Sequence, residues 1–145
     1  MKITTAYIVS ALALFFAPIA GIIILVAMAT LIDSVFGVWR AKKLGEEIKS
    51  KTFRHGFVPK VLSYCGAVML LYTSDYFIIN ELMHLALDFD YLATKIVSLI
   101  LISIEVKSMD ESFTAVKGYS FLQKIIDLII KAKNIKNKIK KDGED

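Results

Sequence analysis

The residues that come nearest to a chemical site, by type and spacing, are Glu81, His84 and Asp88. Steps of three and four residues place these side chains on one face of a helix, and an imidazole with two carboxylates can bind a divalent metal ion. No fourth ligand of suitable type accompanies them. We therefore interpret His84 as an interfacial side chain between two solvated acids, and the sequence predicts no metal site.

Signatures of catalysis are also missing from the 145 residues. The sequence has no glycine-rich phosphate loop, no serine elbow and no pair of cysteines. Cys65 cannot form an intramolecular disulfide, and within an apolar run it is expected to pack as a small hydrophobic residue. We predict a protein that is not an enzyme and that has no catalytic residue and no cofactor.

Four ionisable side chains inside or beside apolar stretches are more informative. They are Asp33, Asp75, Lys95 and Glu105. A charge that faces lipid is costly, so such a group usually faces a bundle interior, a partner charge or water. Antiparallel neighbouring helices would place Asp75 and Lys95 toward the same end, where the two could pair.

Asp33 and Glu105 are expected near the opposite end, where Arg40 or Arg54 could neutralise them. Two roles remain open for these charges, and neither excludes the other: cohesion of a helix bundle, or the lining of a polar lumen formed by oligomerisation. The candidates for oligomer or lumen contacts are Asp33, Gly37, Asp75, Lys95 and Glu105.

The elements that must position these groups are long and apolar. The apolar share of 56% exceeds the roughly 45–50% of soluble domains, and residues 3–32 carry no charged side chain. The net charge of +4 is uneven, because basic residues gather in segment 40–60 and in the C-terminal tail. This pattern predicts a small all-α membrane protein with about three transmembrane helices, expected to be oligomeric.

The first apolar stretch, residues 3–32, is longer than the roughly 20 residues of a perpendicular span, and Pro18 interrupts it. Three interpretations remain open. The stretch could be one long kinked or tilted helix, since proline bends helices. It could be a helix in or against the membrane, followed by a span from about Ile19 to Val38. It could include a cleaved signal peptide, although the apolar run continues well beyond the small-residue site.

Small side chains recur in this stretch at mostly four-residue spacing. Ser10, Ala13, Ala17 and Gly21 share a helix face and would allow close approach of a second helix in lipid. Small residues are common in membrane helices, so a chance occurrence is the alternative. The candidates for helix packing are Ala13, Ala17 and Gly21.

Two further spans are predicted. The second is clear, with Pro59 placed in its first helical turn, where the missing N–H is harmless. The third is weaker, because its uncharged core, residues 96–104, is short. The predicted spans are about 18–39, 57–80 and 91–107, within a transmembrane domain of residues 1–118.

The remainder, residues 119–145, is predicted to be a basic amphipathic helix and tail. Apolar residues recur there at three- and four-residue steps, lysines fill most other positions, and Asp127 opposes them. Such a helix lies on an anionic leaflet or packs in an oligomer. No base-reading element accompanies it, so membrane lipid is the expected partner and nucleic acid is not.

Charge also orients the chain, because short cytoplasmic loops are rich in Lys and Arg. Three spans place segment 40–60 and the tail on one side and the acidic segment 81–90 on the other. The N-terminus is then external and the C-terminus cytoplasmic, in a multi-pass protein. The basic residues predicted at the membrane surface are Arg40, Lys42, Lys43, Arg54, Lys60, Lys131, Lys136 and Lys140.

Residues spread over roughly 25–118 form a diffuse pattern of small and polar side chains. They are Asp33, Gly37, Ser50, Arg54, Gly56, Lys60, Asp75, Glu105, Ser108 and Glu111. In this pattern the chain resembles the toxin-secretion/phage-lysis holin family of small bacteriophage membrane proteins. The long N-terminal run with Pro18 and the basic tail lie outside the pattern.

This resemblance implies a holin of the bacterial cytoplasmic membrane. Such a protein forms homo-oligomers and then opens lesions or pores that release a cell-wall hydrolase (an endolysin) for host cell lysis, or a toxin. The alternative is a scaffold subunit of a larger membrane or phage assembly that forms no pore, because a basic amphipathic helix is a suitable docking element.

Overall fold

The computed structural model describes residues 2–46, 50–79, 81 and 89–142, with side chains within 4–46, 56–79, 81 and 89–136. Every regular element in this part of the chain is helical, which confirms the predicted all-α class. The elements are α1 (Lys2–Phe16), the short 3-10 helix η1 (Ala17–Ile19), α2 (Ala20–Leu44), α3 (Ser50–Ser74), the π-helical turn η2 (Asp75–Ile79), α5 (Leu92–Lys117) and α6 (Phe121–Asp142).

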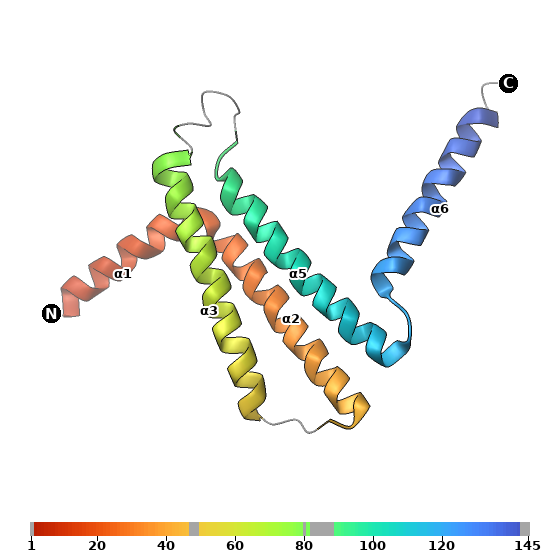
Figure 1. The fold of residues 1–145 in the computed structure, drawn as a ribbon. Helices are drawn as coiled ribbons and strands as arrows, with labels where there is room; N and C mark the ends of the chain where they lie inside the picture. Colours follow the sequence, from red (N-terminus) through yellow and green to blue (C-terminus); the bar gives the residue numbers. More distant parts are fainter. Residues whose placement is uncertain (1, 47–49, 80, 82–88, 143–145) are drawn as a thin grey trace.

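Helices α2, α3 and α5 form a bundle in which α2 packs against both of the others and α3 contacts α5 (Figure 1). The buried apolar cluster of this bundle consists of Ile19, Val26, Val68 and Tyr72. Steps of seven residues on α2 and four on α3 keep these side chains on one helix face. The core lies closer to the end of the bundle where α3 ends than to the end where α2 ends.

Glycines follow two helices of the bundle, α2 and α5. Gly45 follows α2 with φ +74°, and Gly118 follows α5 with φ +75°. Glycine adopts this left-handed conformation without steric cost, and it is the commonest residue just past a helix end. The amide of Gly118 donates to the carbonyl oxygen of Thr114 at 2.8 Å, which closes the last turn of α5.

The first apolar stretch is two helices that meet at an angle (Figure 1). Pro18 lies in η1 between them, where it has no N–H to donate into the preceding turn. The Tyr72 hydroxyl donates to the backbone oxygen of Phe15 at 2.8 Å and ties the end of α1 to α3. The bend therefore has an identifiable cause and a fixed contact, and it separates α1 from the expected first span.

The second predicted span, 57–80, coincides closely with the apolar stretch Gly56–Ile79, but the predicted place of Pro59 is wrong. Helix α3 begins at Ser50, so Pro59 lies inside the helix and not in its first turn. Proline removes one backbone hydrogen bond and bends a helix, but it does not prevent the turns before it from forming. The end of the span, near residue 80, is close to the last turn of η2 at Ile79.

Two stretches are long and apolar enough to cross a membrane, Thr4–Leu44 and Gly56–Ile79. Helix α5 is not one of them, although its 26 residues extend about 39 Å at 1.5 Å per residue. It also runs ten residues past the predicted end of the third span, to Lys117. The structure therefore supports two spans by length and composition, and a third span in α5 stays a prediction.

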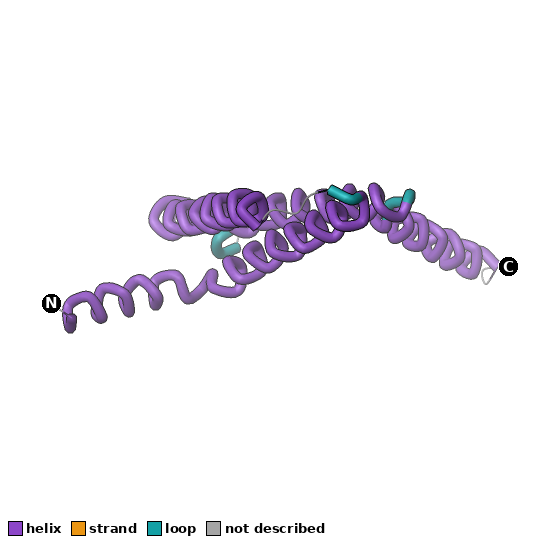
Figure 2. The backbone as a smooth tube through the Cα atoms, turned by 90° about the horizontal axis from the view of Figure 1, so that it is seen from below, coloured by secondary structure: helices purple, strands orange, loops and turns teal. Residues whose placement is uncertain are grey.

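The predicted C-terminal amphipathic helix is present as α6 and begins at Phe121. Helices α1 and α6 both turn away from the bundle, at opposite ends of it, and the two chain termini lie far apart on opposite sides (Figures 1 and 2). Only the first turn of α6 is partly buried, and the side chains of residues 123–136 are all exposed.

Replacing Pro18 with alanine is expected to join α1 and α2 into one straighter helix, because the missing N–H is restored. The measurement is the distance between spin labels at Ala6 and Val38 in the purified protein. It should increase toward the length of an uninterrupted helix of 32 residues, about 48 Å. Pro59→Ala is the matched control and should leave this distance unchanged. An unchanged distance in Pro18→Ala would show that the bend has another cause.

Candidate functional site

One lysine joins the three helices of the bundle. The Nζ atom of Lys60 on α3 lies 2.9 Å from Oδ2 of Asp33 on α2 and 2.6 Å from Oε2 of Glu105 on α5. Each residue of this triad comes from a different helix. A single cation with two carboxylates therefore fixes the positions of α2, α3 and α5 relative to one another.

The triad is largely removed from solvent. The side chain of Glu105 is 0% exposed, that of Asp33 is 12% exposed and that of Lys60 is 30% exposed. Removing such ions from water costs several kcal/mol per ion, and only close pairing and hydrogen bonds offset this cost. Glu105 Oε1 has no hydrogen-bond partner in the described part of the chain. The cluster thus holds one more carboxylate than it has cations.

Polar side chains continue from the triad along the inner face of α5. Thr94, Ser98, Glu105 and Ser112 are all buried. Their spacing of four and then seven residues follows the heptad repeat of a packed helix face. The Thr94–Glu105 segment of this row spans about 16 Å of helix. This row, together with Asp33 and Thr30 on α2, makes the bundle interior polar.

The outer surface of the bundle is apolar by contrast. Leu62 and Leu70 on α3 are 68% and 72% exposed, and Leu99 on α5 is 63% exposed. Among the described residues, as many polar as apolar side chains are buried. A soluble domain buries its large apolar side chains. This bundle differs in that half of its described buried side chains are polar, while many leucine and isoleucine side chains are exposed.

A second buried carboxylate holds the start of α5. Asp75 is 0% exposed, and its Oδ2 accepts hydrogen bonds from the amide of Thr94 at 2.7 Å and from its hydroxyl at 2.5 Å. The first amides of a helix have no intrahelical acceptor, and negative charge is favourable there. Tyr91, the residue before α5, has φ 54° and no capping side chain. The start of α5 therefore has no cap from its own sequence. Asp75, in the π-helical turn that follows α3, caps it instead.

A third acid does the same for α6. Asp110 Oδ2 accepts from the Ser120 hydroxyl at 2.7 Å, and Oδ1 accepts from the amides of Phe121 at 2.8 Å and Leu122 at 3.2 Å. The Ser120 hydroxyl oxygen in turn accepts from the amide of Gln123 at 2.9 Å. These four bonds anchor the first turn of α6 to the last turns of α5.

Aromatic side chains surround this anchor. The rings of Trp39 and Phe113 stack with centroids 6.0 Å apart, and Phe113 meets Tyr119 and Phe121 edge to face at 5.4 and 5.5 Å. Lys124 Nζ lies 3.5 Å from the centre of the Tyr119 ring, a cation–π contact. The end of α2, the end of α5 and the start of α6 therefore meet in one aromatic cluster.

The sequence singled out Asp33 and Glu105 as charges that need a partner, and the structure pairs both with a cation that was not predicted for them. This cation is Lys60, because the register of α3 points its side chain inward at the level of both acids. Arg40 is half-buried, and its Nε has no hydrogen-bond partner among the described residues. The side chain of Arg54 lies outside the described residues, so its predicted pairing stays a prediction. Lys60, predicted at the membrane surface, is 30% exposed and contacts both acids inside the bundle.

The proposed pair of Asp75 and Lys95 is not formed. Asp75 bonds Thr94, one residue earlier, while Lys95 is exposed on the outer side of α5. One residue along a helix is a rotation of about 100°, so the neighbour of a buried threonine points away from it. Gly37, the remaining candidate of this set, is half-buried on α2.

Other predicted residues lie at the surface of the chain. Ala13, Ala17 and Gly21 are exposed, and a Cβ at Gly21 would meet nothing within 4 Å. They contact no other helix closely in one copy, so their role in helix packing stays a prediction about a second chain. Lys42, Lys43, Lys131 and Lys136 are exposed, as predicted for membrane-surface lysines, and the side chain of Lys140 lies outside the described residues.

No group of three metal-ligating side chains occurs among the described residues. His84 and Asp88, which the sequence placed with Glu81, lie outside them. Comparison of the chain with family models, with curated proteins and with solved structures finds no match. The features of the bundle that bear on function are its buried polar groups and its exposed apolar side chains.

Lys60→Met is expected to destabilise the bundle by about 3 kcal/mol, because it leaves two buried carboxylates without a cation. The free energy of unfolding in detergent is the measurement. Lys42→Met, which alters an exposed lysine, should change it by less than about 0.5 kcal/mol. The triple variant Lys60→Met, Asp33→Asn, Glu105→Gln should recover much of the loss. Equal stability of Lys60→Met and the unaltered protein would contradict a structural role for the triad.

Acid is expected to loosen the root of α6. Partial burial alone raises the pKa of Asp110, but hydrogen bonds from Ser120, Leu122 and Phe121 hold it below the ordinary value of 3.8. A group with a lowered folded-state pKa stabilises above its ordinary pKa, and this contribution is lost as the pH falls through the lowered value. The anchor should therefore be intact at neutral pH and weaken only below about pH 3.8.

The same anchor can be tested at neutral pH with Asp110→Ala, which removes both acceptor oxygens. Loss of a helix cap costs about 1 kcal/mol, so amide hydrogen exchange at residues 121–124 should accelerate roughly five-fold. Glu111→Ala changes the neighbouring exposed acid and is the matched control. Unaltered exchange in Asp110→Ala would mean that the aromatic cluster alone orders the first turn of α6.

Proposed function

We propose that the chain is a holin-like protein, without enzymatic activity, that inserts into the bacterial cytoplasmic membrane. There it oligomerises and opens lesions that let a cell-wall hydrolase leave the cytoplasm. The observation that carries this proposal is the combination of buried charge and exposed apolar surface in the bundle. Its interior holds the Lys60 triad and a row of small polar residues beside the apolar cluster, and its exterior is rich in leucine and isoleucine.

The membrane location rests on the outer surface of the bundle. Two stretches are long and apolar enough to cross, and few of their residues are buried within the chain. Water would make this exposed apolar surface costly, at about 25 cal/mol for each Å². Lipid removes that cost, and it leaves the buried charges as the groups that need protein partners.

Helix α5 is proposed as a third span in the same bundle. Its outer face carries Ile96, Leu99, Ile100 and Ile104, all exposed. Its charged residue at mid-helix, Glu105, faces inward and is paired with Lys60. A helix that packs along α2 and presents isoleucine outward fits lipid despite its polar inner face. Three spans place the N-terminus outside and the C-terminus inside, in agreement with the basic segments.

The lesion-forming step is proposed to use the polar interior. In one copy, α2 and α3 cover the polar row of α5. Lateral association that parts these helices would turn the row, the triad and Asp75 toward a shared lumen, where water could solvate them. No active site is required for this reaction, since the work is done by helix association and by charges that change their surroundings.

A scaffold role without a pore is the second candidate, and the isolation of α6 favours it. The side chains of residues 123–136 are exposed, and α6 stands apart from the bundle beyond its root (Figure 1). A helix in that position can dock on another subunit. Co-purification of such a subunit in fixed stoichiometry, without leakage of dye from reconstituted vesicles, is the outcome that selects this candidate.

The direct test is expression of the chain in bacteria together with a cytosolic cell-wall hydrolase. Expression alone should collapse the membrane potential, and the pair should lyse the culture, whereas the hydrolase alone should not. Verified membrane expression at a high level with neither effect would remove the lesion-forming role.

Asp75→Asn is expected to change oligomer size or the time of lysis by more than Glu81→Gln. Asp75 holds the start of α5 from inside the bundle, whereas Glu81 is exposed. The measurements are cross-linking in membranes and the onset of lysis in the same cultures. If both variants behave as the unaltered protein does, the Asp75 contact has no part in assembly.

A further inference from the structure

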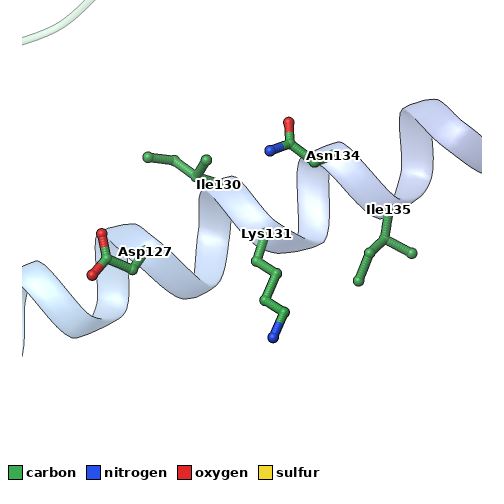
Figure 3. Close-up of a pocket in the computed structure, with 5 residues that line it drawn as sticks. All are labelled: Asp127, Ile130, Lys131, Asn134 and Ile135. Atoms are coloured by element: carbon green, nitrogen blue, oxygen red, sulfur yellow. The ribbon is translucent and has the colours of Figure 1, made fainter.

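Helix α6 presents an exposed surface that no other described part of the chain covers. Figure 3 shows Asp127, Ile130, Lys131, Asn134 and Ile135 projecting from one helix into open space on several sides. The apolar side chains of this helix from Ile125 to Ile135 are exposed, and its described lysines are exposed as well. A surface of this kind needs a partner that accepts both apolar and cationic side chains.

Apolar and basic side chains are separated along the axis of α6 as well as around its circumference. Residues 121–130 include seven apolar side chains and one lysine, and residues 131–141 include six lysines. In the first half, Ile125, Leu128 and Ile129 share one broad side, and Gln123 and Asp127 lie on the other. In the second half, lysines occupy most of the helix circumference, and Ala132, Ile135 and Ile139 continue the apolar side. The partner must therefore be apolar beside the root of α6 and anionic along its outer half.

The root of α6 lies at a defined level of the bundle. Trp39 and Phe113 stack there, and Tyr119 and Phe121 pack against Phe113. Tryptophan and tyrosine collect at the boundary between hydrocarbon and headgroups. The exposed Lys42 and Lys43 lie in the last turn of the same α2. If α2 crosses the membrane, α6 leaves the bundle at headgroup depth.

The Asp110 anchor determines how α6 leaves that level. Hydrogen bonds hold Ser120, Phe121 and Leu122 on the end of α5, so the helix starts at a fixed place. It then turns away from the bundle and slants back toward the level at which α3 ends, and it does not continue along the α5 axis (Figure 1). The side chains of residues 123–136 are exposed along this course.

We propose that α6 binds along the anionic headgroup surface of the membrane that the bundle crosses, with its first half in the interface and its second half among acidic lipids. This inference rests on the membrane location in the proposed function and not on lesion formation. Interfacial helices combine a basic face with an apolar one in this way. Each lysine near an anionic leaflet strengthens the contact by about five-fold.

Charge argues against a second copy of α6 as the partner. Phe121, Ile125, Leu128, Ala132 and Ile135 form a seven-residue repeat that could serve as the seam of a coiled coil. However, Lys124 and Lys131 border this seam, and Asp127 and Asp142 are the sole acids in the helix. Two copies would therefore bring unpaired lysines together. Nucleic acid would satisfy the lysines but leave the apolar half uncovered.

The test uses the full chain with Cys65→Ala, carrying a nitroxide at Leu128→Cys or Asn134→Cys. The protein is reconstituted into vesicles of phosphatidylcholine alone or mixed equally with phosphatidylglycerol. Accessibility of the label to oxygen and to a water-soluble nickel complex reports its depth. In the anionic vesicles the label at 128 should be shielded from nickel and the label at 134 should stay accessible. In phosphatidylcholine alone both labels should be more accessible.

The variant Lys131→Gln, Lys133→Gln, Lys136→Gln should reverse the shielding, because three lost charges lower the ratio of bound to free α6 on the order of 100-fold. The matched control Lys42→Gln, Lys43→Gln, Lys117→Gln removes the same charge outside α6 and should leave the label depth unchanged. High salt should act as the α6 variant does.

Three outcomes would overturn the inference. They are equal depth in both lipid mixtures, dipolar coupling between labels of different copies, and a shift in accessibility caused by duplex DNA and not by anionic lipid. Flotation of the vesicles after an alkaline wash separates the two proposals. A chain that does not float overturns the membrane location as well, whereas a chain that floats with lipid-independent label depth overturns the α6 contact alone.

Discussion

The contact of Lys60 with Asp33 and Glu105 is the constraint on which the arrangement of α2, α3 and α5 depends. Between helices in lipid, apolar packing offers little preference for one register over another, because lipid tails are as apolar as leucine. A buried carboxylate without a cation is costly at any register except the one that pairs it. The triad therefore selects the level at which three otherwise similar helices align. Asp75 and Thr94 apply the same constraint at the other level of the bundle.

This use of polar contacts accounts for the share of polar side chains in the interior, which equals that of apolar ones among the described residues. The apolar side chains are abundant and interchangeable. They allow α2, α3 and α5 to associate, but they do not select one register of the three helices. The few polar residues define the geometry because each must be satisfied. The proposed function uses the same groups, since charges that hold a compact bundle together can line a watery space once the helices separate. Stability and lesion formation then compete for one set of side chains.

The amino-acid sequence was sufficient for the class of fold, the amphipathic C-terminal helix and the identity of the critical acids. Periodicity and composition carry that information, because they are properties of single helices. The partners were not predictable in the same way. Lys60 was assigned to the surface because it belongs to a basic segment, and its inward direction depends on where α3 begins, nine residues before Pro59. The predicted partner of Asp75 was wrong by one residue. Successive residues of a helix point in directions about 100° apart, so Thr94 faces Asp75 and Lys95 does not. The inward row of Thr94, Ser98, Glu105 and Ser112 was detectable as a seven-residue repeat within an apolar stretch.

The Asp75 cap has a consequence for the connection that precedes α5. A helix start is usually encoded next to the helix, by a residue whose side chain binds the first free amides. In this chain the acceptor comes from the preceding helix, and Tyr91 at the boundary provides none. The starting point of α5 is thus independent of the length and composition of the connecting segment. Insertions or deletions between η2 and α5 are therefore compatible with an unchanged register of the bundle, because the contact that fixes the start of α5 does not involve the connecting segment.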